Sequence, residues 1–408
     1  MRRPAATLAV LTVLAFSSPS EADDSVAQSS RSDRFRIHGF ISQAWADASI
    51  EGPKPSLLFT NQPDLVFGIP EDGTFKYHTL ALQLRYAFQE QTTFVLQVDY
   101  ENAGDDLIAS DKGVELDWAF LAHRFKNGLD VKLGRIPTPI GLFNEIRDVG
   151  VLLPFYRPAG AFYGEGNLHS ATIDGLLISQ SFFRDKAWIL ACDAYFGTWD
   201  IPEVFSEPTG GLQVREARAR DVVGAQLWLE SRQGDIRLGL GGNLHDGTGG
   251  VLREALGETD HESWHASVEA TVGSFTGRAE YRYRSFGPLT SPRAAFDSEF
   301  ENYYFQVGYQ FDEHLSVWLQ WDSAVLETFV LPPQQLDQPS VQDPYEAAGP
   351  AIAVNYAFTP KLVLKAEYHH AERDLTTTIV PVAPPLVFRL QSESQETRYS
   401  ILSLSYAF

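Results

Sequence analysis

Apolar and polar residues alternate along most of this chain with a period of two. In the segment 92–102, Phe94 and Leu96 lie on one side of the pattern, and Gln97 and Asp99 lie on the other. Because successive side chains of a strand point to opposite faces, this period predicts strands with one apolar and one polar face. The same alternation, with charged residues on the second face, occurs in 275–286 and 361–373.

Sixteen segments carry this alternation, and the connections between them are alternately short turns and long loops. That rhythm is typical of an antiparallel up-and-down barrel with tight turns at one rim and extended loops at the other. A misassigned hairpin would make the barrel one of fourteen or eighteen strands. The predicted strands are 35–48, 77–88, 92–102, 114–125, 129–136, 171–183, 187–198, 220–231, 235–245, 262–273, 275–286, 299–311, 315–326, 351–358, 361–373 and 395–408.

Alternation alone also fits a soluble β-sandwich, whose polar face would look outward. The end of the chain favours a membrane barrel, because Phe408 and Tyr406 fall on the apolar face, where their rings would reach the lipid headgroups. The same Tyr-x-Phe ending closes the predicted strands at 86–88, 309–311 and 356–358.

The N-terminus predicts export from the cytoplasm. Residues 1–22 combine two arginines, an apolar run and a small-x-small cleavage site, which together indicate a signal peptide. Residues 23–34 lack apolar periodicity and are predicted to be a short disordered leader before the barrel domain, 35–408. After the signal peptide, no apolar run approaches the roughly 18 residues that a membrane helix needs.

The C-terminal strand and the segment 133–148, which contains Gly134-Arg135 and a Pro-x-Gly turn, resemble those of Gram-negative outer-membrane porins. The resemblance implies an all-β transmembrane barrel in the outer membrane, with the third long loop, here 137–170, folded into the lumen. It also implies that Phe408 and Tyr406 form the signal that the barrel-assembly machinery reads. Membrane lipids would surround such a barrel, small hydrophilic solutes would pass through it, and three copies would form a homotrimer.

The composition of the loop 137–170 suits a constriction. Four prolines stiffen it, and its many apolar side chains could anchor it against the wall. Arg135 lies two residues after Leu133 and therefore falls on the same outward side of the strand, and we expect a bulge at Gly134 to turn it inward. With charges of both signs, the passage would sort solutes by size and charge. The predicted constriction and pore-lining residues are Arg135, Glu145, Arg147, Asp148, Arg157, Glu165, Arg85, Lys132, Arg278, Arg282, Arg284 and Lys365.

Two of these assignments have structural alternatives. Arg147 and Asp148 could pair with each other within the loop. The ladder formed by Arg278, Arg282 and Arg284 could be neutralised by Glu280 and Glu269 rather than form an anion path. His261 and His265 are four residues apart, hence about 13 Å along a strand, and we expect them to be separate lumen or loop residues.

Composition narrows the function. The formal net charge of −21 argues against a nucleic-acid partner, and a single cysteine, Cys192, excludes an intramolecular disulfide. No catalytic motif or metal-ligand spacing is present, so we expect no enzyme activity, metal or cofactor. The predicted function is that of an outer-membrane porin that passes small hydrophilic solutes or ions. The alternatives are a substrate-specific channel with a binding site in the third loop, and a barrel that serves as scaffold for an enzyme or adhesin.

Overall fold

A computed structural model gives the structure of this protein. It describes residues 34–52, 65–66, 68–104, 113–164, 171–206, 212–248, 259–288, 295–331, 340–341, 345–376 and 392–408. The predicted signal peptide 1–22 and all but the last residue of the leader 23–34 lie outside these ranges.

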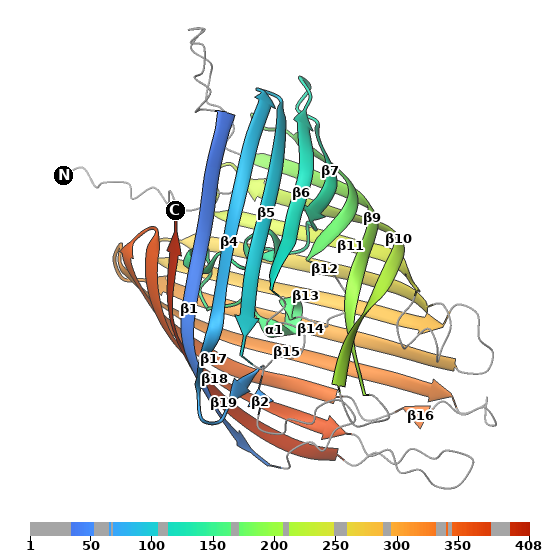
Figure 1. The fold of residues 1–408 in the computed structure, drawn as a ribbon, viewed down its shortest axis with the longest axis vertical. Coiled ribbons are helices and arrows are strands. Elements are labelled where there is room, and N and C mark those ends of the chain that lie inside the picture. The colour runs from blue at the N-terminus through green and yellow to red at the C-terminus, as the bar shows by residue number, and fades with distance from the viewer. Residues whose placement is uncertain are drawn as a thin grey trace.

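The described residues form one closed antiparallel sheet with sixteen long strands (Figure 1). Strands that follow one another in the chain are neighbours in the sheet, and β1 closes the ring by pairing with both β4 and β19. The long strands are β1 Phe35–Glu51, β4 Thr74–Gln89, β5 Thr92–Ala103, β6 Val114–Arg124, β7 Asp130–Pro137, β8 Thr172–Phe182, β9 Trp188–Ser206, β10 Leu212–Ser231, β11 Ile236–Thr248, β12 Thr259–Val272, β13 Phe275–Pro288, β14 Ala295–Gln310, β15 Leu315–Leu331, β17 Tyr345–Thr359, β18 Leu362–Thr376 and β19 Ser392–Ala407.

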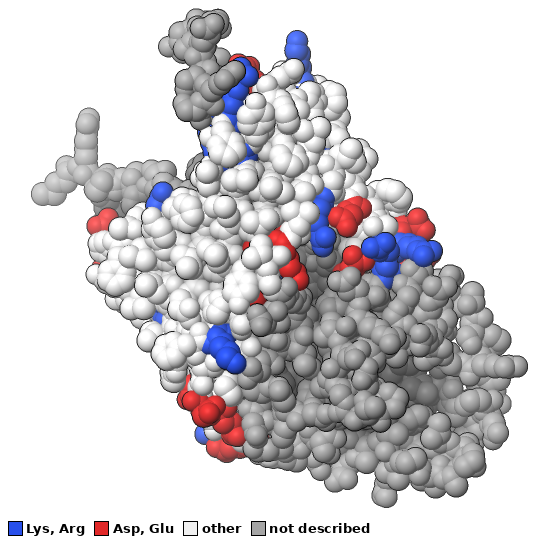
Figure 2. All heavy atoms as spheres, viewed as in Figure 1, with Lys and Arg blue, Asp and Glu red and all other residues white. Residues whose placement is uncertain are grey.

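The apolar side of the alternation faces outward. Leu240, Leu319 and Leu402 are 56%, 56% and 49% exposed, whereas the inward residues Gln226 and Glu367 are 0% and 5% exposed. Figure 2 shows a wall that, over its described part, is mostly free of charged side chains. This distribution excludes the β-sandwich alternative, in which the apolar face would be covered by a second sheet.

All sixteen predicted strands are present, and most are longer than predicted at the end next to a long loop. The strand predicted from 220 begins at Leu212, and the strand predicted to end at 326 continues to Leu331. Above the lipid both faces of a barrel strand contact water, so the apolar signal stops there although the backbone pairing continues.

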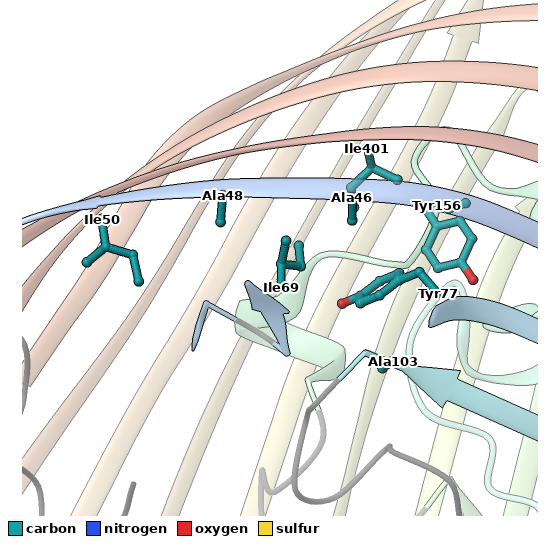
Figure 3. Close-up of a cluster of buried hydrophobic side chains, with 9 residues drawn as sticks. Ala46, Ala48, Ile50, Ile69, Tyr77, Ala103, Tyr156 and Ile401 are labelled. Carbon is teal, nitrogen blue, oxygen red and sulfur yellow. The ribbon is translucent and has the colours of Figure 1, made fainter. Parts of the chain in front are cut away.

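The connection between β1 and β4 contains a small hairpin that the sequence pattern did not predict. Its strands are β2 Leu65–Val66 and β3 Ile69–Pro70, and a further two-residue strand, β16 Ser340–Val341, pairs with β15. Ile69 is fully buried and packs with inward side chains of neighbouring strands, as Figure 3 shows. The first long connection therefore also contacts the inner face of the wall. The other members of this cluster are Ala44, Ala46, Ala48, Ile50, Tyr77, Ala103, Tyr156 and Ile401.

The connection between β7 and β8 contains short helical elements. Two 3-10 turns, η2 Asn144–Ile146 and η3 Gly150–Leu152, precede the four-residue helix α1 Gly160–Tyr163. In the described part of the chain, no helix is long and apolar enough to cross a membrane.

Candidate functional site

The connection after β7 contacts the opposite side of the barrel. Around the ring, β7 and β15 are separated by seven strands in either direction, yet the described residues 138–164 contact side chains on β13, β14, β17, β18, β19 and β1. These side chains belong to the inward, polar side of the alternation. Figure 1 draws α1 within the ring of strands, next to β13, β14 and β15. We call residues 138–164 the crossing segment.

Glu280 of β13 is the first anchor of the crossing segment. Its Oε1 accepts hydrogen bonds from the backbone N–H of Leu142 at 2.9 Å and from the Ser267 hydroxyl at 2.5 Å. Its Oε2 accepts from the hydroxyl of Tyr304 at 2.6 Å and from that of Tyr163. A carboxylate has about four lone-pair sites, so all of its acceptor capacity is used.

The hydroxyl of Tyr163 joins the segment to itself as well as to the wall. It accepts a hydrogen bond from the backbone N–H of Phe143 at 2.9 Å while donating to Glu280. Burial, together with the neighbouring Glu280 carboxylate, raises the pKa of the Tyr163 hydroxyl well above its usual value. The phenol therefore stays protonated and remains a donor at neutral pH.

A second anchor lies on β17 and β18, where three wall side chains bind successive backbone groups. Asn355 Nδ2 donates to the carbonyl of Pro154 at 2.9 Å, and Lys365 Nζ donates to that of Phe155 at 2.8 Å. Glu367 Oε1 accepts from the N–H of the next residue, Tyr156, at 2.5 Å. Since irregular backbone must find partners when it is buried, these wall groups explain how the segment can lie there.

The third contact lies where β1 and β19 meet. Gly150 packs so closely there that an added Cβ would meet the hydroxyl oxygens of Ser42 and Ser405. Those two hydroxyls are 2.8 Å apart and join the first strand of the barrel to the last. Val149 packs beside them against Phe40. The crossing segment therefore covers the seam of the barrel.

The charged residues predicted for the loop have different environments. Arg157 forms an ion pair with Glu101 of β5, and Glu145 is exposed. Arg147 and Asp148 lie 3.9 Å apart, so the alternative of a pair within the loop is confirmed, and Arg147 also donates to the carbonyl of Tyr163 at 3.2 Å. Glu165 lies outside the described residues.

The predicted charges of the wall, with one exception, lie on the inward side. Lys365 is fully buried at the second anchor, and Lys132 is buried with its Nζ 5.6 Å from the Phe120 ring. Arg85 is half-buried near the short-turn rim. Arg278 pairs with Glu269 at 2.5 Å, so neutralisation by Glu269 is confirmed for this member of the ladder.

The predicted bulge at Gly134 is wrong. The pairing of β7 with both β6 and β8 is continuous, and Arg135 stands opposite Asp174 on the outward side. Gly134 has a φ of +132°, and a Cβ there would clash with the backbone of Ala119. The glycine thus allows β6 and β7 to approach closely, while side chains along β7 continue to alternate between inward and outward. Arg135 is therefore not on the inner wall.

The sequence pattern missed several inward residues of this site. Tyr304 and Asn355 could have been found from their parity, because both lie on the polar side of their strands. Their roles depend on the crossing segment, which is distant in sequence. Within the described residues, no group of three or more His, Cys, Asp or Glu is arranged to hold a metal ion.

Comparison with known proteins gives a likeness in fold. No family model and no curated protein sequence matches the chain. The outer-membrane channel DcaP of Acinetobacter baumannii superposes with a TM-score of 0.54 at 12% identity, over 92% of this chain and 97% of that one. An outer membrane protein of Vibrio cholerae, OmpT, in its trimer form, gives 0.53 at 11% identity over 92% and 99%. An anion-selective porin from Comamonas acidovorans gives 0.52 at 12% identity, also over 92% and 99%.

These likenesses and the closed sheet define the fold. The chain is a sixteen-stranded antiparallel barrel, and it shares this fold with the outer-membrane proteins named above. The predicted fold class is thereby confirmed.

Proposed function

We propose that this protein is a porin-like channel of the outer membrane that passes small hydrophilic solutes passively and catalyses no reaction. The observation that carries the proposal is the crossing segment, which starts at β7 and bonds to inward side chains on the far wall. Such a segment leaves a narrower passage than the strands alone would enclose. Polar inward side chains would keep that passage wet.

The crossing segment and the charges beside it would form the constriction. Arg147, Asp148 and Arg157 belong to the segment, and Arg278 lies against it, 5.2 Å from the Phe143 ring. Charges of both signs next to a narrow aqueous passage act on solutes more strongly than in bulk water. The predicted passive filter therefore remains our proposal, with Glu145 at its exposed edge.

Location and assembly belong to the same proposal. Residues 1–22 would direct export, and Phe408 and Tyr406 would be read by the barrel-assembly machinery. The OmpT relative in fold is described in a trimer form, which supports a homotrimer here. The number of copies can be measured by sedimentation in detergent.

Single-channel conductance in planar bilayers tests the proposal. The wild-type protein should conduct, and excision of residues 141–160 should leave a folded barrel with higher conductance that admits larger sugars. A folded barrel that conducts no ions would overturn the channel function and leave the scaffold alternative. If the excision variant has unchanged conductance and an unchanged size cut-off, the crossing segment does not form the constriction.

A further inference from the structure

A cluster of donor side chains lies on the inner wall beyond the Glu280 anchor, toward the long-loop rim. The register aligns Asn243 of β11, Ser263 of β12 and Arg284 of β13 in one row across the sheet. The adjacent row contains His265 and Arg282, and the row beyond Asn243 contains the stacked rings of His245 and His261, 4.6 Å apart. These rows line a small cavity that is open on one side.

Two arginines of this cluster lie side by side on the inner wall. Arg282 and Arg284 are 1% and 4% exposed and lie two residues apart on one face, hence about 7 Å from each other. Glu280, the next inward residue along β13, already accepts four hydrogen bonds from the crossing segment and the wall. It therefore has no lone pair left for Arg282.

A buried charged donor at the cavity lacks an acceptor among the described residues. Arg282 donates through Nε to the Ser263 hydroxyl at 3.1 Å, while its Nη1 has no partner. The amide of Asn243, a residue that is 4% exposed, also lies at the cavity, beside the Tyr195 hydroxyl. An unmade hydrogen bond of a buried charged group is costly, so a bound acceptor would stabilise this arrangement.

The crossing segment forms one side of the site. Phe162 of α1 lies with its ring 5.7 Å from the Arg282 guanidinium and 6.0 Å from the His265 ring. Phe162 is fully buried, so it excludes water on that side of the guanidinium. A charged ligand here would interact with Arg282 in surroundings of lower polarity than bulk water, where the attraction is stronger.

We propose that this cluster is a binding site for a small oxyanion, a carboxylate or phosphate group of a permeating solute. Arg282 supplies the unpartnered donor, Asn243 adds a neutral amide donor, and Arg284 adds a second positive charge. The site lies on the long-loop side of the crossing segment, so an anion from that rim would bind before it reaches the constriction. This assignment rests on the proposed channel function and gives it a substrate class.

The first test measures potassium chloride current through the wild-type channel while inorganic phosphate or acetate is added at constant ionic strength. We expect a saturable fall in current. Arg282→Gln should weaken the apparent affinity at least tenfold, and Asn243→Ala should weaken it several-fold. Arg124→Gln is the matched control, because it removes an arginine on the polar side of β6 near the short-turn rim and should leave the affinity unchanged.

The second test measures binding of the same two anions to the folded barrel in detergent by titration calorimetry, which needs no conductance. Binding without conductance would support the site and overturn the channel function. Conductance without binding or saturable block would overturn the site and leave the channel function intact. Equal affinities in wild type, Arg282→Gln and Asn243→Ala would also overturn the site. Should Arg282→Gln fail to fold, Asn243→Ala decides alone.

The two anions distinguish the source of the bound group. Binding of phosphate alone would support the site and assign it to phosphorylated solutes, and binding of acetate alone would assign it to carboxylates. Binding of both would support an oxyanion site that accepts either group.

Discussion

Gly141 is the residue at which the crossing segment comes closest to its first anchor. Its φ is +62°, and an added Cβ would meet the Tyr163 hydroxyl and lie 2.6 Å from Glu280 Oε1. Both the backbone conformation and the space therefore require glycine. The next residue, Leu142, donates its N–H to the same carboxylate, so a shift here would separate the segment from the wall.

Gly141→Ala should loosen this anchor while the barrel remains folded. The left-handed backbone costs roughly 1–2 kcal/mol with a side chain, and the methyl group must displace the tyrosine or the carboxylate. We expect a larger and noisier single-channel current. Gly160→Ala is the control, because a Cβ there meets nothing within 4 Å. Identical currents in the two variants would contradict the role of Gly141.

Lys365 allows a test at the second anchor. Its buried ammonium group donates to the carbonyl of Phe155, and Lys365→Met keeps a side chain of similar length but removes that donor. The middle of the crossing segment should then be less tightly held, which would raise the conductance. Lys361→Met, the same change at an exposed position in the preceding turn, should not. If both variants conduct like wild type, Lys365 does not hold the segment.

At the scale of the strand, the polarity tolerated at an outward position depends on how deep that position lies in the membrane. Val268 and Val272 lie on the same outward side of β12, with Val272 at the short-turn end and 76% exposed. Four residues of a tilted strand place Val268 roughly 10 Å deeper.

Val268→Arg should destabilise the folded barrel by about 2–4 kcal/mol, and Val272→Arg by about 0–1 kcal/mol, because the cost of a charge falls toward the interface. Urea unfolding of both variants in liposomes measures the difference. A larger loss for Val272→Arg would mean that the membrane depth assigned to β12 is wrong.

Much of the strand arrangement was predictable, because parity is a local property of the sequence. The outward Phe94 and inward Gln97 could be assigned from their neighbours alone, and the structure confirms both. The three anchors could not be predicted, since each joins residues more than 100 positions apart, as Leu142 and Glu280 are. Arg135 failed for another reason. Its place in the alternation put a charge on the outward side, and the bulge assumed at Gly134 to turn it inward is excluded by the continuous pairing of β7.

The oxyanion site was also only partly predictable. Arg282 and Arg284 were assigned to the lumen from their parity, and the structure places both on the inner wall. Asn243 and His245 carried the same signal but were not singled out, because their importance depends on the register between β11 and β12. A cluster spread over adjacent strands becomes visible only when the pairing is known.

At the scale of the whole molecule, the first and last strands meet to close the barrel. Gly39 and Phe408 exchange backbone hydrogen bonds of 2.9 and 3.2 Å, and the Phe408 ring fills the space that a side chain at position 39 would need. Phe408 is 45% exposed on the outward side, beside the Tyr406 ring.

Deletion of Phe408 should lower the yield of folded, heat-modifiable barrel, because it removes both backbone bonds and an interfacial ring. Phe358→Ala is the control, since Tyr356 and Phe358 form a similar ring pair away from the seam. A defect in cells but not in liposomes would assign the residue to recognition by the assembly machinery. Wild-type yield in both settings would contradict either role.

The position of Gly150 at the junction of β1 and β19 links the width of the proposed passage to the stability of the closed barrel. The crossing segment that would set the width of the passage also packs on Ser42 and Ser405, whose hydroxyl contact joins residues 363 positions apart. Among the sixteen long strands, β1 and β19 are neighbours in the sheet but not consecutive in the chain. Opening the barrel at this junction would also disturb the crossing segment. If the proposed channel function holds, a variant that widens the passage by losing the segment should also unfold more readily, so permeability and resistance of the barrel to unfolding would change together.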